Sequence, residues 1–148
     1  MSYRTATAAR PDSARVDLAL AVLRVLIGII FVAHGGQKLF VYGFDGVTGA
    51  FAGMGIPLPG LAGPLAALVE FFGGLALVTG LLTRVAGLGL AVTMLGAIGF
   101  AHLREGFFAP KGFEFPLALL GATVALALAG AGRFSLDHAI AQRRRPAA

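Results

Sequence analysis

The amino-acid sequence predicts an all-α integral membrane protein that folds as an antiparallel four-helix bundle. Only 13% of the 148 residues are charged and 57% are hydrophobic, whereas soluble domains carry about 25% charged residues. Four apolar runs are long enough to cross a bilayer, at residues 18–40, 61–82, 85–101 and 115–131. The 22 glycines suit such a bundle, because small residues let helix backbones approach closely.

The four runs are predicted to be helices rather than strands. The shortest of them reaches about 26 Å at about 1.5 Å per residue, enough to cross a thin hydrocarbon core. A helix pairs its backbone polar groups internally, as lipid requires, and no run alternates polar and apolar residues as membrane strands do. The membrane domain is therefore predicted at residues 18–138, between a basic segment at 1–17 and a basic tail at 139–148.

The first run, residues 18–40, is predicted to be a retained helix. Arg24 interrupts its apolar part and three further runs follow, unlike a cleaved signal peptide. The loop that follows, residues 41–60, is rich in Gly and Pro but also contains Phe44 and Met54. This composition favours a short helix at the membrane interface.

The second run, residues 61–82, contains one charged residue, Glu70. A charge near the centre of a membrane helix costs roughly 2.5–3.5 kcal/mol on insertion scales, so such a residue normally faces the bundle interior or a wet cavity. The third and fourth runs are uncharged. Gly87 and Gly121, each followed four residues later by alanine, predict close helix contacts in these runs.

The distribution of basic residues predicts a multi-pass protein of the cytoplasmic membrane with both termini in the cytoplasm. The loops at 41–60 and 102–114 contain only Arg104 and Lys111, and Lys and Arg are retained on the cytoplasmic side. The other arginines outside the runs lie near the termini or in the turn between the second and third runs: Arg4, Arg10, Arg15, Arg84, Arg133, Arg143, Arg144 and Arg145. Nucleic-acid binding is not expected, because no binding motif accompanies the basic ends.

This topology collects polar residues near the outer end of the bundle. His34 and Lys38 share a helix face because they are one turn apart. Glu70 is predicted roughly 9 Å below Pro64, near the outer start of the second run. His102 ends the third run. We expect a semi-buried pocket with a carboxylate in its wall, a cation nearby and two imidazoles within reach.

A protonatable cluster beside lipid suits a quinone head group, whose carbonyl oxygens accept hydrogen bonds and whose reduction requires protons. In this hypothesis Glu70 and His34 are the catalytic residues that handle protons. The predicted quinone-binding residues are Lys38, His102, Glu114 and Gln37.

Simpler interpretations of these residues remain open. Glu70 could pair with Lys38 or His34 to hold the bundle, the histidines could be packing or interfacial residues, Lys38 could extend to the lipid head groups, and Glu114 could serve a helix dipole.

Arg24 belongs to the opposite end of the bundle, about two turns in from the cytoplasmic side. Its candidate partners are Asp17 and Asp137, and a structural ion pair between Arg24 and Asp137 is predicted.

The absence of cysteine excludes disulfides, thiol catalysis, c-type haem and cysteine-ligated clusters within these 148 residues. His34, His102 and Glu70 are conceivable metal ligands, but no H-E-x-x-H-type spacing supports them, so no metal is predicted. A b-type haem is not expected, because His34 and His102 would have to face each other across the bundle.

Three segments carry a resemblance to a known family: LRVLIGIIFVAHGGQKL at 23–39, VEFFGGLALVTGLLTR at 69–84 and AGAGRFSLD at 129–137. In order and spacing the chain resembles the DoxX family of small bacterial membrane proteins from Leu20 to His138. The resemblance implies four membrane helices. The family's namesakes are a subunit of an archaeal thiosulfate:quinone oxidoreductase and a mycobacterial membrane component linked to thiol redox defence. The residues at positions typical of the family are Arg24, His34, Lys38, Glu70, Arg84, Arg133 and Asp137.

Three functions are compatible with these observations. The chain could be a quinone-interacting subunit of a redox complex, not catalytic alone, with a redox-enzyme subunit as its partner. It could be a non-catalytic membrane anchor or assembly factor, in which the polar cluster only holds the bundle. It could also be a small proton-coupled transporter that uses Glu70 as its protonation site. Each function places the chain in contact with lipid, and each is compatible with a homo-oligomer.

Overall fold

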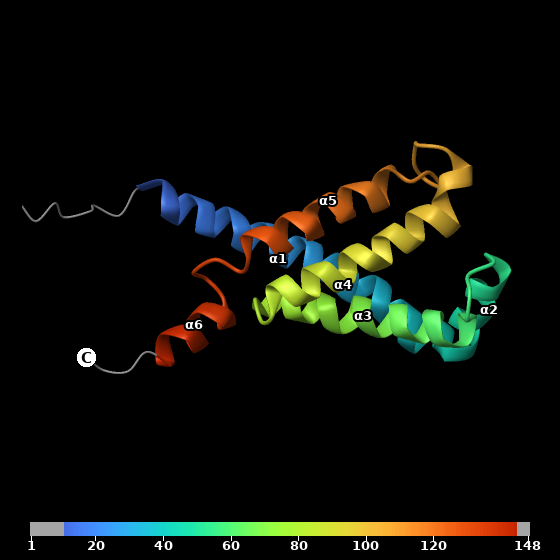
Figure 1. Cartoon of the computed structure of the whole chain (residues 1–148), viewed down its shortest axis with the longest axis horizontal. Coiled ribbons are helices and arrows are strands. Elements are labelled where there is room, and N and C mark those ends of the chain that lie inside the picture. The colour runs from blue at the N-terminus through green and yellow to red at the C-terminus, as the bar shows by residue number, and fades with distance from the viewer. Residues whose placement is uncertain (1–10, 145–148) are drawn as a thin grey trace, which may run out of the picture.

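The computed structural model describes residues 11–144, and all regular structure in this part of the chain is helical (Figure 1). The prediction of an all-α membrane protein is confirmed. The predicted basic ends extend into residues 1–10 and 145–148, including Arg4, Arg10 and Arg145, which lie outside the described residues. The helices in chain order are α1 Pro11–Gly36, η1 Gln37–Tyr42, α2 Gly43–Gly53, α3 Pro59–Thr79, α4 Thr83–Gly96, η2 Ala97–His102, η3 Leu103–Glu105, α5 Glu114–Ala129 and α6 Leu136–Arg143.

Within the described residues, three helical stretches are long and apolar enough to cross a membrane: Ser13–Gly53, Pro59–Thr79 and Thr83–Glu105. The fourth predicted span coincides with α5, a shorter apolar helix of 16 residues that reaches about 24 Å. A fourth crossing therefore stays a prediction. A helix, α2, does occur in the predicted first outer loop. Its direction departs from that of α1 (Figure 1) because the chain turns at Gly43, where φ is +67°.

Helices α1 and α3 cross at a glycine-lined contact. A Cβ atom at Gly35 would lie 2.4 Å from the backbone nitrogen of Phe71, and one at Gly28 would lie 2.7 Å from the carbonyl oxygen of Gly74. Only glycine permits such an approach between two helix backbones. Gly35 therefore fixes the position of the last turns of α1 against the middle of α3.

Helices α4 and α5 pack through a second small-residue contact. A Cβ atom at Gly87 would lie 2.8 Å from the carbonyl oxygen of Thr123, which confirms the predicted contact at Gly87. The prediction for Gly121 is wrong, because this residue is exposed and nothing lies within 4 Å of its would-be Cβ. The buried core between the helices consists of Phe31, Leu77, Leu90, Met94, Leu119 and Leu126.

Arg24 is buried with only 4% of its surface exposed. It makes no contact of ion-pair length with Asp137, although that carboxylate is close enough to attract the guanidinium. The guanidinium donates hydrogen bonds to the carbonyl oxygens of Leu77 (2.9 Å) and Val78 (2.7 Å), and also to that of Phe134. The last carbonyls of α3 have no partner within their helix and carry the negative end of its dipole. A cation at this position therefore satisfies α3 and ties it to the chain before α6.

Asp137 instead caps the next helix. Its two carboxylate oxygens accept hydrogen bonds from the backbone N–H groups of Leu82 (2.8 Å) and Thr83 (3.1 Å), at the start of α4. The Ser135 hydroxyl caps α6 by accepting from the His138 N–H at 3.2 Å. Near the start of α1, Asp17 accepts a hydrogen bond from the Arg133 N–H at 3.1 Å. The residues at 129–137 therefore connect α1, α3, α4 and α6 at the end of the bundle where the described chain begins and ends (Figure 1).

Candidate functional site

The one ion pair among the described residues joins η1, the helix that continues α1, to α3. Lys38 Nζ lies 2.5 Å from Glu70 Oε2, and the side chains are 23% and 7% exposed. The contact follows from the glycine crossing, because Lys38 lies three residues beyond Gly35 and faces the part of α3 that Gly35 touches. Glu70 lies about 16 Å along α3 from Pro59, close to the middle of this helix. It is deeper than predicted, since α3 begins at Pro59 rather than near Pro64.

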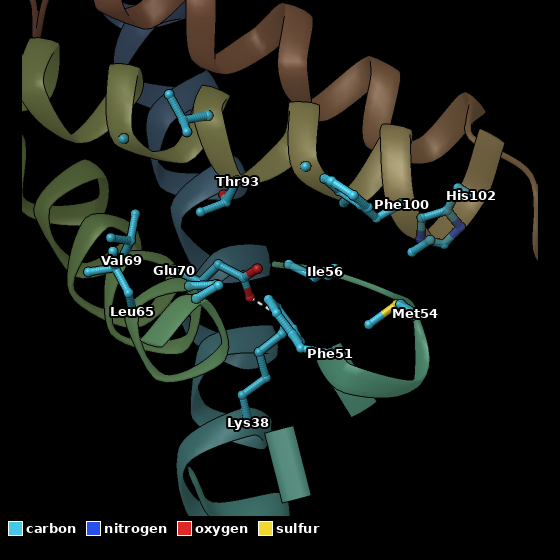
Figure 2. A pocket seen from close by; sticks show the side chains of 17 residues that line it. Lys38, Phe51, Met54, Ile56, Leu65, Val69, Glu70, Thr93, Phe100 and His102 are labelled. Atoms are coloured by element: carbon cyan, nitrogen blue, oxygen red, sulfur yellow. Dashed lines mark hydrogen bonds and ion pairs between the residues drawn. The ribbon is translucent and has the colours of Figure 1, made fainter. Parts of the chain in front are cut away.

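A cavity of about 540 Å³ lies beside the ion pair, between α3, α4, η2 and the α2 region. Figure 2 shows the carboxylate of Glu70 held by Lys38 in its wall, with Thr93 and His102 contributed from above. The remaining lining is apolar and comprises Phe51, Met54, Ile56, Ala62, Leu65, Ala66, Val69, Gly89, Val92, Gly96, Ala97, Phe100 and Ala101. The cavity is therefore an apolar space with one polar wall.

A second cavity, of about 120 Å³, lies on the α5 side of the same ion pair. It shares Lys38, Glu70 and His102 with the larger cavity and adds His34. The His34 side chain is exposed, and its ring lies 6.4 Å from that of Phe115. The structure thus brings four of the predicted site residues together, with the ion pair between the two cavities.

His102 is oriented by the loop that follows it. Its Nδ1 lies 2.6 Å from the carbonyl oxygen of Lys111. Because a carbonyl can only accept, Nδ1 must carry the proton, and Nε2 of the neutral ring is then an acceptor.

Two predicted quinone-binding residues lie outside both cavities. Glu114 Oε1 accepts a hydrogen bond from the Ala109 N–H at 2.7 Å, so this carboxylate orders the loop before α5. Gln37 is exposed, since neighbours in a helix point about 100° apart and Lys38 takes the inward direction. The predictions that Glu114 and Gln37 belong to the pocket are wrong, because neither residue lines either cavity.

Thr93 and the apolar side chains that Phe51, Met54 and Ile56 contribute to the cavity were not predicted as site residues from the sequence. Thr93 lines the larger cavity, and its hydroxyl donates to the carbonyl oxygen of Leu90 at 2.8 Å. Thr93 could have been singled out from the sequence, because it carries a hydroxyl group in the otherwise apolar third run. Phe51 and Met54 belong to the loop whose apolar residues predicted a short helix, but nothing in the sequence indicated that they line a cavity beside Glu70. Within the described part of the chain, no three His, Asp or Glu side chains come close enough to hold a metal ion.

Comparison with known proteins identifies the family. The DoxX family model matches residues 19–103. An uncharacterised membrane protein of Mycobacterium tuberculosis is 35% identical over 132 residues, covering 82% of this chain and 80% of the relative. The "Putative oxidoreductase CatD" of Bacillus subtilis is 34% identical, covering 82% and 86%. The inner membrane protein YqjF of Escherichia coli is 36% identical, covering 82% and 92%. No solved structure matches significantly. The chain is a membrane protein that belongs to the DoxX family.

Proposed function

We propose that this chain is a quinone-interacting subunit of a redox complex in the bacterial cytoplasmic membrane. The observation that carries the proposal is the Lys38–Glu70 pair in the wall of an apolar cavity of about 540 Å³. Small-molecule sites typically enclose about 300–1,000 Å³ and combine apolar walls with a few polar groups. The name of the Bacillus subtilis relative, "Putative oxidoreductase CatD", points in the same direction.

The residues of the polar wall have complementary tasks in this proposal. Reduction of a bound quinone consumes two electrons and two protons. Lys38 Nζ donates a hydrogen bond to a head-group carbonyl, and Glu70 gives and takes protons beside it. Neutral His102 accepts a hydrogen bond at Nε2 from the hydroxyl of the reduced form. His34, exposed and lining the smaller cavity, links Glu70 to the outer surface. The electrons come from a partner redox subunit.

The proposed orientation has both termini in the cytoplasm and the ion pair in the half of the bundle nearer α2. The start of α1, the start of α4 and helix α6 lie toward the same end of the bundle (Figure 1). These segments and the link before α6 contain Arg15, Arg84, Arg133 and Arg143, and basic residues favour the cytoplasmic side. The Escherichia coli relative is an inner membrane protein.

A non-catalytic anchor is the second candidate, and one observation favours it. The Glu70 carboxylate already has a partner at 2.5 Å, directly beside the glycine crossing of α1 and α3. A closed ion pair there would hold two membrane helices together without any ligand.

Titration of the purified protein in mild detergent with menaquinone and ubiquinone analogues separates the two candidates. A quinone site predicts saturable binding that weakens in Glu70→Gln and Lys38→Met. Gly96→Leu should also abolish binding, since Gly96 lines the larger cavity and its would-be Cβ meets open space. Gly99→Leu is the matched control, because Gly99 also has open space but lines neither cavity. Binding that is unchanged in Glu70→Gln and Gly96→Leu, or absent in the wild type, would contradict the proposal.

A further inference from the structure

The larger cavity is a wedge between α3 and α4. On the side of Glu70 nearer the α3–α4 turn these helices are in contact, since a Cβ atom at Gly73 would lie 3.1 Å from the Leu90 side chain. Toward the α2 end the two helices diverge (Figure 1), and the cavity fills the space between them. The closed end of the wedge prevents a ligand from reaching the pocket between the helices from that side.

The side of the wedge is open and apolar. Leu65 on α3 is 54% exposed, Val92 on α4 is 68% exposed and Phe100 on η2 is 48% exposed, although all three line the cavity. A side chain that both lines a cavity and lies on the outer surface marks the mouth of that cavity. These residues belong to stretches that are apolar enough to cross the membrane, so the mouth faces hydrocarbon rather than water.

The polar wall lies at the inner end of the same space. Glu70 is 5% exposed and is close to the middle of α3, about 16 Å from its first residue. Apolar side chains also line the cavity at the end of α2 and just after it, namely Phe51, Met54 and Ile56 (Figure 2). A ligand reaching Glu70 through the mouth passes only apolar groups first.

We propose that the pocket takes its ligand sideways from the bilayer, through the mouth formed by Leu65 and Val92. The ligand class is a membrane-dissolved amphiphile with a ring head group that offers carbonyl oxygens and with a long apolar tail. The head group lies against Lys38 and Glu70, and the tail leaves between α3 and α4 into the lipid. The inference rests on the proposed quinone function and adds the route and the requirement for a tail.

The experiment compares two probes with the same naphthoquinone head group, tail-less menadione and a menaquinone with an isoprenoid tail, bound to the protein in lipid nanodiscs. Val92→Trp narrows the mouth, and Leu88→Trp is the control because Leu88 is 61% exposed on the same helix but lines neither cavity. Val92→Trp should weaken the tailed probe by roughly tenfold, equivalent to about 1.4 kcal/mol, while menadione binds as before. Leu88→Trp should leave both probes unchanged.

A protection assay gives a readout that does not depend on tolerance of the larger side chain. The chain contains no cysteine, so Val92→Cys and Leu88→Cys are single-thiol proteins. The tailed probe should slow the reaction of Cys at position 92 with a membrane-permeant maleimide, menadione should slow it less, and neither should affect position 88.

The outcomes separate this inference from the proposed function. If both probes bind the wild type but neither the Val92→Trp effect nor the protection depends on the tail, the sideways route is wrong and the quinone site stands. If neither probe binds the wild type, the quinone site and the route through Leu65 and Val92 both fail.

Discussion

The Lys38–Glu70 pair predicts an asymmetric response to neutralising its two members. At 2.5 Å and an effective dielectric constant of about 20, the gross attraction is about 7 kcal/mol, but desolvation of the two groups offsets most of it. Lys38→Met leaves the Glu70 carboxylate, 7% exposed, without a partner, which should cost about 3–5 kcal/mol. Glu70→Gln should cost about 1–2 kcal/mol, because the Lys38 side chain is 23% exposed and can extend its ammonium outward.

The assay is the free energy of unfolding, measured by titrating sodium dodecyl sulfate into mixed micelles and following helicity by circular dichroism. The double variant Lys38→Met with Glu70→Gln should be more stable than Lys38→Met alone, because a coupling energy of about 2–3 kcal/mol exceeds the cost of Glu70→Gln. Lys111→Met controls for removal of a lysine, since Lys111 is exposed, and should change stability by no more than about 0.5 kcal/mol. Equal effects of Lys38→Met and Lys111→Met, or additive effects in the double variant, would show that the Lys38–Glu70 pair does not stabilise the bundle.

Three further predictions concern the bundle. Gly35→Ala should cost about 1–3 kcal/mol, because the new Cβ atom would lie 2.4 Å from the Phe71 backbone. Gly36→Ala is the control and should be tolerated, because its Cβ atom would lie 3.6 Å from the Phe71 ring. Equal free energies of unfolding for the two variants would contradict a close crossing at Gly35. Arg24→Met should cost about 2–4 kcal/mol in the same titration, because the carbonyl oxygens that accept hydrogen bonds from the buried guanidinium would lose this donor. An unchanged free energy of unfolding would show that Arg24 does not stabilise α3. Asp137→Ala should cost about 1 kcal/mol through loss of the α4 cap, and hydrogen exchange should quicken at the first amides of α4 but not in α5; uniform exchange would argue against a cap.

The helices and their apolar character could be predicted from the sequence because hydropathy and length are local properties. The runs at 61–82 and 85–101 correspond to α3 and to α4 with η2. Glu70 stood out for the same reason, as the single charge in its run, and its burial follows from the cost of exposing it to lipid. His34, Lys38 and His102 were placed at the same level by topology alone.

The errors concern contacts that only the fold decides. Arg24 was predicted to pair with a carboxylate, but its guanidinium instead donates hydrogen bonds to carbonyl oxygens at the end of α3. Asp137 accepts hydrogen bonds from backbone N–H groups at the start of α4. Gly35 looked like one glycine among 22, and its importance appears only where two backbones touch. Glu114 and Gln37 were included for their neighbourhood in the sequence, which does not determine the direction of a side chain.

Native mass spectrometry of protein extracted from bacterial membranes in mild detergent shows whether the cavity beside Lys38 and Glu70 holds a quinone in the cell. We expect a bound species with the mass of the host quinone in the wild type and in Gly99→Leu, and its loss in Gly96→Leu. A wild-type protein that carries no quinone, or a Gly96→Leu protein that retains it, would rule out the proposed quinone site.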